Sequence, residues 1–572
     1  MQSPQGAGAA GIASQGTSRT PAVAHLASAT VSACPLWDDG FRTFVALWGQ
    51  MQVLRLCMQA CRTRLTVFEW LNSTGLWATT LSMSSFMCIA FPDEATLVAA
   101  LGSSLACAWA SMPDEIDNGR PLEVLTHINL LVGLCWALMT GRHAFDGWLV
   151  ASPAICSLLS ITFAFAALAR LNKDFHNIRC SSAAVLVVRS LDTLLSQCRV
   201  KALPKLLVDI LDSRVGDFFV KIAAVVMIAV MDIIGCSIPV MLCLGFHSTV
   251  AVLIWMMCLL LATTHAFDFS CLIVSLLPFL GPPQNLSRLH WMTLTSTSRL
   301  ICFTLTSLVC GASLLLRSKL HMPLQLFAVL WLMAAEPLQY TAHVTTIVDP
   351  ECRRMISAAA AIGDHERGFV HLVAKLSIFI ALLNGMAPYV GLKTQSTWTL
   401  FSNLRVEDGC TNHWLIPASW QIFGYTKECV TVTMSNIPLL RDMCLTASTE
   451  AGTDELQVLR GFHERTGTVI SVCGSSAASG DYNIDARSGE WQPTAMPFFQ
   501  LRCIIAAHTL PCFDEFYVDY VHCGVQHHFE VRRSRPQKGS EQRLAQRPHG
   551  LLVKLLTFRA FPATERTGPC SY

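Results

Sequence analysis

The chain has 572 residues, of which 52% are hydrophobic and only 14% are charged. A soluble domain of ordinary composition carries about 25% charged residues, so this composition excludes a single soluble globular protein and favours a membrane protein. The formal net charge is +2, and from Lys393 onward 17 Lys and Arg balance 17 Asp and Glu. The chain lacks the basic excess of nucleic-acid-binding proteins, and we expect no nucleic-acid partner.

The first 36 residues are rich in Ala, Ser, Gly and Gln, and Arg19 is the only Lys or Arg among them. This composition predicts a disordered N-terminal tail over 1–36. The 24 cysteines are scattered through apolar segments and never form paired CxxC motifs at zinc-ligand spacing. We therefore expect no metal site.

Apolar stretches fill the chain from 67 to 391, and a helix needs roughly 20 such residues to cross about 30 Å of hydrocarbon. The sequence predicts an α-helical multi-pass membrane bundle of about 8–10 spans. The candidate spans lie near 67–91, 95–112, 123–140, 149–169, 219–238, 240–264, 265–281, 298–316, 323–342 and 370–391.

The longest interruption of the apolar pattern runs from 170 to 221 and contains nine Lys or Arg. Its leucines recur at helical spacing in "SLDTLLSQC" and "LPKLLVDILDS". A cationic amphipathic pattern of this kind is typical of helices that lie in the membrane interface.

From 392 to 572 the pattern changes to short segments separated by turns, such as "VTVTMS", "GTVISVCG" and "YNIDARSGEW". The segment "EFYVDYVHCGVQHHFEV" alternates apolar and polar residues around Cys523 and Gly524, which predicts a β-hairpin. The segment "TAMPFFQLRCIIAAHTL" has the apolar spacing of a helix. We expect a small soluble α+β C-terminal domain.

The stretch "APYVGLKTQSTWTLFSNLRVEDGCTNHWLIP" follows the last predicted span. Together with three further stretches it carries a resemblance to a known family. They are "LARLNKDF", "LGFHSTVAVLIW" with "FDFSCLIVSLLPFLGPP", and the terminal "LLVKLLTFRAFPATERTGPC". In this order they resemble the vitamin K-dependent γ-carboxylase-like family, also called the horizontally transferred transmembrane domain family. The resemblance covers roughly 400 residues, from the middle of the membrane region to the C-terminus.

The resemblance implies an enzyme that uses reduced vitamin K, or another quinone, as its cofactor and a deprotonated lysine as its base. In the family pattern this lysine precedes Leu in "KLD" or "KLN", whereas here Arg170 precedes Leu171. A guanidinium does not lose its proton at any working pH, so glutamate carboxylation is disfavoured. Lys173 lies three positions later, one helical turn away, and could replace Arg170 as the base only if the helix continues that far. His127 in "LTHINLLVGLCWAL" matches a second family feature. We expect His127, Arg170 and Lys173 to approach one another at one end of the bundle.

Several ionisable residues lie within the predicted spans. A charge at the centre of a membrane helix costs about 2.5–3.5 kcal/mol on insertion scales, so each needs a partner, a proton or a watery cavity. We regard them as candidate functional residues or as packing residues of the bundle; they are Asp232, His247, Asp268 and Glu336.

The junction after the last span contains Asn403, Arg405, Asn412 and His413. Side chains of these types hydrogen-bond backbone groups in turns, which favours a structural clasp between the two regions. The alternative is that these four residues face a cavity at the membrane surface.

Three functions are compatible with these patterns. The first is a membrane enzyme that acts on a lipophilic quinone or lipid, as the resemblance implies. The second is a proton- or cation-coupled transporter that uses Asp232 and Glu336, although no internal repeat of the hydropathy pattern supports it. The third is a non-catalytic membrane protein whose C-terminal domain binds a partner. The lipid bilayer is an expected partner of all three, and a lipophilic small molecule is the expected ligand of the first.

Overall fold

The computed structural model describes most of the two predicted regions. The described residues are 35–62, 67–110, 119–177, 181–183, 214–244, 246–261, 267–280, 368–399, 402–437, 493–508, 515–532 and several positions between 544 and 562. The predicted N-terminal tail before residue 35, most of the interfacial segment 170–221 and the expected spans near 298–316 and 323–342 lie outside this set.

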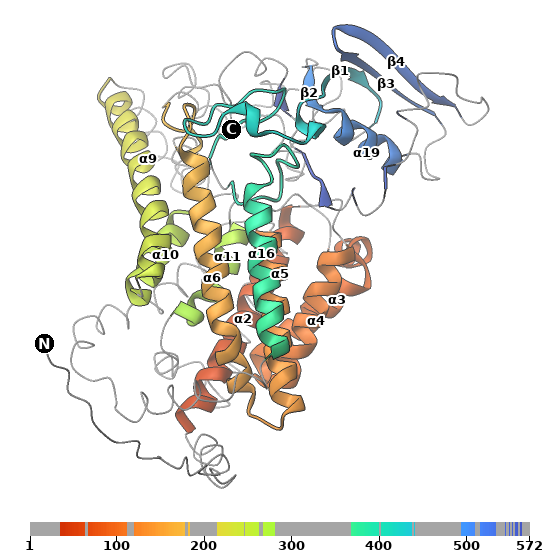
Figure 1. The fold of residues 1–572 in the computed structure, drawn as a ribbon. Coiled ribbons are helices and arrows are strands. Elements are labelled where there is room, and N and C mark those ends of the chain that lie inside the picture. Colours follow the sequence, from red (N-terminus) through yellow and green to blue (C-terminus); the bar gives the residue numbers. More distant parts are fainter. Residues whose placement is uncertain are drawn as a thin grey trace, which may run out of the picture.

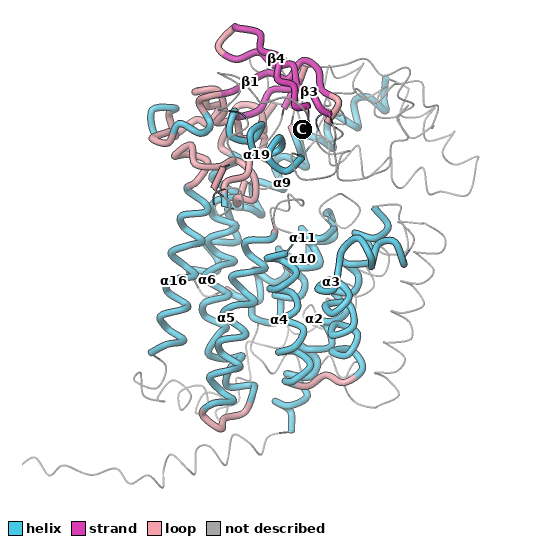
Figure 2. Tube along the Cα trace, turned by 90° about the vertical axis from the view of Figure 1, so that its right-hand side faces the viewer, coloured by secondary structure: helices cyan, strands magenta, loops and turns pink. Residues whose placement is uncertain are grey.

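The larger region is a bundle of helices, with the C-terminal sheet at one end of it (Figure 1). Figure 2 shows the same arrangement from the side, with the strands beyond the ends of α6 and α16. The helices are α2 (Pro35–Arg62), α3 (Val67–Ala90), α4 (Glu94–Ala110), α5 (Arg120–Met139), α6 (Ala144–Arg170), α9 (Arg214–Cys243), α10 (His247–Leu261), α11 (Phe267–Leu276) and α16 (Gly368–Met386).

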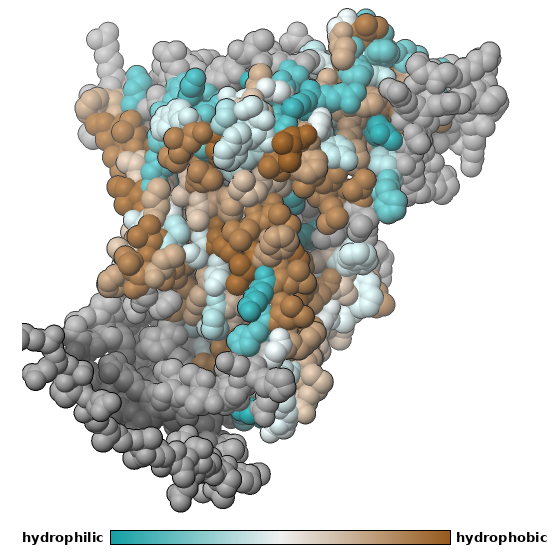
Figure 3. All heavy atoms as spheres, viewed as in Figure 1, coloured by the Kyte–Doolittle hydropathy of each residue, from teal (hydrophilic) through white to brown (hydrophobic). Residues whose placement is uncertain are grey.

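Within the described part of the chain, four helices are long and apolar enough to cross a membrane, over Arg120–Met139, Ala144–Arg170, Lys221–Cys243 and Gly368–Met386. The face of the bundle in Figure 3 is mainly hydrophobic, and most hydrophilic residues on it lie towards the C-terminal domain. These features indicate an integral membrane protein. Among the described residues the apolar parts of α3, α4, α10 and α11 are shorter, so the structure supports part of the predicted set of spans.

One predicted helix boundary differs from the structure. The sequence pattern breaks at Pro239, yet α9 continues through this proline to Cys243. Proline is tolerated inside membrane helices because neighbouring groups satisfy the backbone carbonyl that loses its donor. The break comes instead between α9 and α10, which begins at His247.

Small residues bring the helices close together. A Cβ atom on Gly133 of α5 would collide with the Gly147 backbone of α6, and one on Gly147 would collide with Gly133. A Cβ atom on Gly385 of α16 would enter the ring of Phe165. Helices in membranes associate through such close backbone approaches, because lipid gives them little hydrophobic driving force.

The sequence pattern did not predict α2. This helix contains Asp38, Asp39 and Arg42, which lower its hydropathy, but its centre packs inside the bundle. Phe44, Leu47 and Trp48 are buried, together with the polar Gln50, Gln52 and Arg55. The helical region therefore begins before residue 67, with a helix whose central polar residues are buried in the bundle.

The C-terminal domain contains a five-stranded antiparallel sheet in the order β4-β3-β1-β2-β5. The strands are β1 (Cys429–Ser435), β2 (Thr494–Pro497), β3 (Glu515–His522), β4 (Val525–Arg532) and β5 (Phe561–Pro562). The predicted hairpin is confirmed: β3 and β4 pair around Cys523 and Gly524, both with positive φ, as a two-residue hairpin turn requires.

The segment that predicted a helix near 494–510 begins as β2 and becomes helical only in α19 (Phe498–His508). Residues from α19 and the strands share one apolar core that includes Ile505, Val430, Val518 and Phe529. The segments "GTVISVCG" and "YNIDARSGEW" lie outside the described residues. A mostly helical chain with a small α+β C-terminal part is therefore observed.

Candidate functional site

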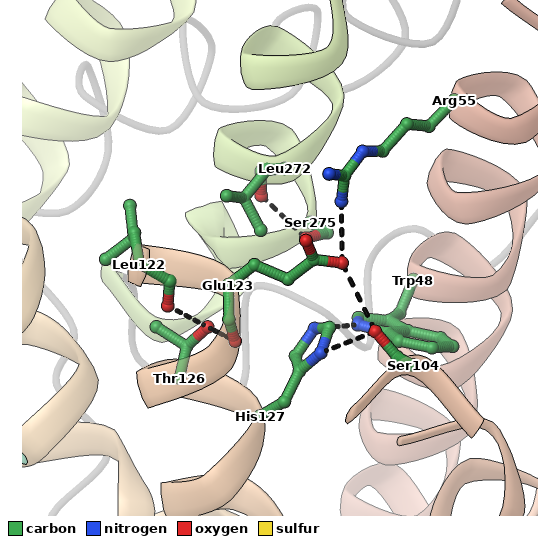
Figure 4. A network of polar contacts seen from close by, with 9 residues as sticks. All are labelled: Trp48, Arg55, Ser104, Leu122, Glu123, Thr126, His127, Leu272 and Ser275. Atoms are coloured by element: carbon green, nitrogen blue, oxygen red, sulfur yellow. Dashed lines mark hydrogen bonds and ion pairs between the residues drawn. The ribbon is translucent and has the colours of Figure 1, made fainter. Parts of the chain in front are cut away.

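A buried polar network lies inside the bundle where α2, α4 and α5 meet (Figure 4). Arg55 of α2 pairs with Glu123 of α5, with 2.6 Å between Nη1 and Oε1. Ser104 of α4 lies 3.2 Å from the same carboxylate oxygen and 3.0 Å from Nδ1 of His127. Trp48 of α2 donates from Nε1 to Nε2 of His127 at 3.3 Å. All five side chains are buried.

The chemistry of the donors gives this network a direction. The indole N–H of Trp48 can only donate, so Nε2 of His127 must accept and the proton of the neutral ring is on Nδ1. Nδ1 then donates to the Ser104 hydroxyl, and that hydroxyl donates to Glu123. The result is an ordered chain of hydrogen bonds from Trp48 to a carboxylate whose charge Arg55 balances.

A second polar site lies where α6 ends beside α9. Arg170 is the last residue of α6 and only 3% exposed. Its Nη1 donates to the Met231 carbonyl of α9 at 2.8 Å, and its guanidinium lies over the Phe175 ring. A Cβ atom on Gly235 would collide with this guanidinium, so a glycine at this position of α9 gives Arg170 its space.

His176 and Asp232 extend this second site. Nδ1 of His176 lies 3.6 Å from a carboxylate oxygen of Asp232 in α9. The imidazole stacks on Trp414, with 4.6 Å between ring centroids and 15° between planes, and Phe175 meets it edge-on. Among the described residues, neither Nε2 of His176 nor Nε of Arg170 has a hydrogen-bond partner, although both atoms are buried. Two buried polar nitrogens are thus available at the end of the bundle.

The structure does not bring His127 and Arg170 together. The backbones of α5 and α6 meet at Gly133 and Gly147. A helix rises about 1.5 Å per residue, so Arg170 lies about 34 Å from this crossing along α6. His127 lies about 9 Å from the crossing along α5, in the same direction. The two residues are therefore about 25 Å apart along the helix axes. Arg170 groups instead with His176 and Asp232.

Lys173 follows Arg170 by three residues, but the two side chains have different surroundings. Its side chain is exposed, and its backbone N–H donates to the Asn412 carbonyl at 3.1 Å. The helix that carries Arg170 ends before it, because α6 stops at Arg170 and a turn follows. The condition under which Lys173 could replace Arg170 as the base, a helix that continues to Lys173, is therefore not met.

The four junction residues lie where this turn meets the loop after the last span. Asn412 donates from its side chain to Asp174 Oδ2 and to the Asn403 carbonyl, both at 2.7 Å. Asn403 has a positive φ of 50° and accepts from the Ser182 N–H at 2.6 Å. The Arg405 N–H donates to Asn412 Oδ1 at 2.8 Å, and the Arg405 side chain is buried. These contacts are those that a structural clasp requires.

His413 joins the same junction to α6. Its Nε2 lies 2.8 Å from the Leu168 carbonyl, while Nδ1 accepts from the backbone N–H groups of Leu415 and Ile416 at 3.0 Å each. Since a carbonyl can only accept, the proton is on Nε2 and the ring is neutral. Burial lowers the pKa of His413, with the hydrogen bond to Leu168 acting in the opposite direction.

The remaining ionisable residues are spread through the bundle. Asp268 is buried in the first turn of α11. His247 begins α10, but its side chain lies outside the described set, and so does the whole of Glu336. Within the described residues, no group of three or more His, Cys, Asp or Glu is placed to hold a metal ion.

The sequence patterns do not identify all members of the polar sites. The residues they miss are Trp48, Arg55, Ser104, Glu123 and His176. One signal was available, because Glu123 and His127 are four residues apart and share one face of a helix. The other partners come from separate helices, and no spacing in the sequence relates them.

A partly buried lysine near the junction leads to a pH prediction. Lys393 donates from Nζ to the Ser396 carbonyl at 3.2 Å, and burial lowers its pKa to about 8. An exposed lysine in the unfolded chain has a pKa of about 10.4. The unfolded chain therefore binds more protons between these values, and stability should rise with pH from about 8 to about 10.

Lys393→Met should remove this rise and increase the free energy of unfolding at pH 7 by up to about 3 kcal/mol, since one pKa unit corresponds to about 1.4 kcal/mol. The measurement is denaturant unfolding in detergent micelles at several pH values, with exposed Lys427→Met as the control. An unchanged pH profile in Lys393→Met would contradict this assignment.

Comparisons with protein-family models, with curated proteins and with solved structures give no match for this chain.

Proposed function

We propose that this integral membrane protein is a divergent member of the carboxylase-like family. In this proposal it binds the oxygen end of a lipophilic quinone or lipid at Arg170 and does not carboxylate glutamate. The proposal rests on the sequence resemblance for the family and on the environment of Arg170 for the ligand class.

The observation that carries the proposal is the buried guanidinium at the end of α6. Arg170 uses Nη1 on a backbone carbonyl, while Nε has no hydrogen-bond partner among the described residues. Buried polar groups of native proteins are nearly always hydrogen-bonded, so an unsatisfied donor at a helix end suggests a missing partner. An oxygen of a ligand that enters from the bilayer would satisfy it.

The neighbours of Arg170 fit such a ligand. Phe175 and Trp414 supply flat apolar surfaces, and His176 supplies a second buried nitrogen without a partner in the described structure. Sites for lipophilic molecules combine mainly apolar surfaces with a few fixed polar groups that orient the ligand. Asp232 offsets the positive charge of Arg170, which lowers the cost of keeping the guanidinium in the bundle.

The same geometry argues against the base-dependent reaction that the resemblance implies. Arg170 remains charged and cannot remove a proton from a quinol. Lys173 is exposed and lies in the turn beyond the end of α6, away from the buried surroundings of Arg170. The ordered network around His127 lies about 25 Å away along the hairpin, at a rise of about 1.5 Å per residue.

Binding of vitamin K1 hydroquinone to the purified full-length chain in detergent tests the proposal. We expect saturable binding by the wild type and at least about tenfold weaker binding by Arg170→Met, because charge-assisted hydrogen bonds contribute about 1.5–3 kcal/mol. The matched control is Arg142→Met, which removes an arginine from the opposite end of α6 and should leave binding unchanged. Absence of saturable binding by folded wild type, or equal binding by Arg170→Met, would contradict the proposal.

The same preparations separate binding from chemistry and from transport. We expect no carboxylation of a glutamate peptide by the wild type, and weak epoxide formation only in Arg170→Lys, where burial can lower the pKa of the new amine. Lys173→Ala should have no effect. Proton or cation flux in proteoliposomes without quinol binding would instead favour the transporter alternative, in which Asp232 contributes to an ion pathway.

A further inference from the structure

The loop after the clasp exposes apolar side chains next to the ends of two candidate spans. Residues 414–424 read "WLIPASWQIFG" and contain no charged side chain. Ile422 is 74% exposed and Leu415 68% exposed. The other large exposed apolar residues of this loop are Trp414, Trp420 and Phe423.

Backbone hydrogen bonds attach this loop to the helix ends. The Trp414 N–H donates to the Leu171 carbonyl at 2.9 Å, one residue beyond the end of α6. The Phe423 N–H donates to the Val390 carbonyl at 3.0 Å, in the turn that follows α16. The loop is therefore fixed at the level where both spans end.

Local bonds also hold the loop in shape. His413 accepts from the N–H groups of Leu415 and Ile416. A short 3-10 turn covers Ala418–Trp420, and the buried Gln421 donates from its side chain to the Cys410 carbonyl at 3.0 Å. Because the backbone is tied on both sides, the exposure of Leu415 and Ile422 is a fixed feature of the junction.

The exposed surface of α16 leads to this loop. Seven large apolar side chains of α16 are exposed over the length of the span, namely Phe369, Leu372, Leu376, Phe379, Ile380, Leu382 and Leu383. A span with such a surface faces lipid hydrocarbon. The loop is hydrogen-bonded to the turn at the end of this span, and Trp residues in membrane proteins concentrate at the membrane–water boundary.

We propose that residues 414–424 insert into the interfacial layer of the phospholipid bilayer and hold the C-terminal domain on the membrane surface. The structure favours acyl chains and headgroups as the occupant, because the loop is uncharged and adjoins a lipid-facing helix. A protein partner would cover the loop but would leave the continuity with α16 unexplained. This proposal does not depend on the ligand of Arg170.

Site-specific photocrosslinking in nanodiscs tests the insertion. Benzoylphenylalanine replaces Ile422 or Trp420 in the full-length chain, and the bilayer contains phosphatidylcholine with alkyne-tagged acyl chains. Phe379 of α16 is the positive control. Val525 is the matched negative control, because it is also apolar and exposed but lies at the β3–β4 turn, away from the bundle (Figure 1).

We expect tagged lipid to attach at Ile422, Trp420 and Phe379 at a level several-fold above that at Val525. Labelling of Ile422 and Trp420 at the Val525 level would overturn the proposal. A protein adduct at Ile422 in place of lipid would also overturn it and would identify a partner surface. If no lipid attached at Phe379, α16 would not face lipid, and this result would also contradict the proposal.

Discussion

Arg55→Met is expected to destabilise the helical bundle by about 3–5 kcal/mol, because it leaves the Glu123 carboxylate buried without its cation. The ion pair is short and both side chains are 6% exposed, so water cannot replace the lost partner. The Ser104 hydroxyl would still lie 3.2 Å from the Oε1 oxygen that Arg55 contacts. The measurement is the free energy of unfolding in mixed micelles at neutral pH.

A double-mutant cycle separates the ion pair from simple loss of packing. Arg55→Met combined with Glu123→Leu removes both charges and should recover most of the lost stability, since apolar replacements of buried pairs are often neutral or better. Arg142→Met removes a partly exposed arginine and should cost less than about 1 kcal/mol. Additive effects of Arg55→Met and Glu123→Leu would show that the two groups do not interact as the structure places them.

The local parts of this fold follow from the sequence alone. The hairpin at Cys523 and Gly524 was predictable because alternation and turn residues are properties of neighbouring positions. The candidate spans α5, α6, α9 and α16 were predictable because a long apolar helix shows in composition. In both cases the physical cause acts within about 20 residues of chain.

The polar sites could not be predicted in the same way. The network of Trp48, Ser104 and His127 joins three helices, and its members are ordinary residues in ordinary sequence contexts. The helix α2 was not predicted for a related reason, since polar side chains at its centre, such as Gln50 and Arg55, are buried in the bundle. Burial of a polar residue depends on what packs against it, which local patterns do not contain.

The junction contains contacts that the sequence predicts and contacts that it does not predict, within a few residues of one another. Asn412 and His413 were predicted to hydrogen-bond backbone groups, and they do. Asn172, which is completely buried, was not singled out, although its contacts link the turn after α6 to the loop beyond α16. Its role could not be predicted from local sequence, because it hydrogen-bonds the carbonyl of Ser402, which lies 230 residues later in the chain.

Asn172→Ala is expected to be the most damaging substitution at this junction. Asn172 Oδ1 accepts from the N–H groups of Asp174 and Phe175 at 3.0 and 2.8 Å, and Nδ2 donates to the carbonyls of Ala169 and Ser402. Alanine would leave buried backbone groups unsatisfied, each at about 1–3 kcal/mol, so we expect a total loss of about 3–5 kcal/mol.

We expect Asn172→Ala to loosen the junction locally in addition to lowering the free energy of unfolding of the whole protein. Without the bridge between Ala169 and Ser402, the turn at 171–177 and the loop at 402–416 can separate while the helices stay packed. Hydrogen exchange of the Asp174 and Phe175 amides should therefore accelerate more than exchange in α5. Asn172→Asp keeps the acceptors for these two amides and should protect them better than Asn172→Ala does. The control is Asn177→Ala at an exposed position of the same turn, and equal exchange in this control and in Asn172→Ala would show that Asn172 does not hold the junction.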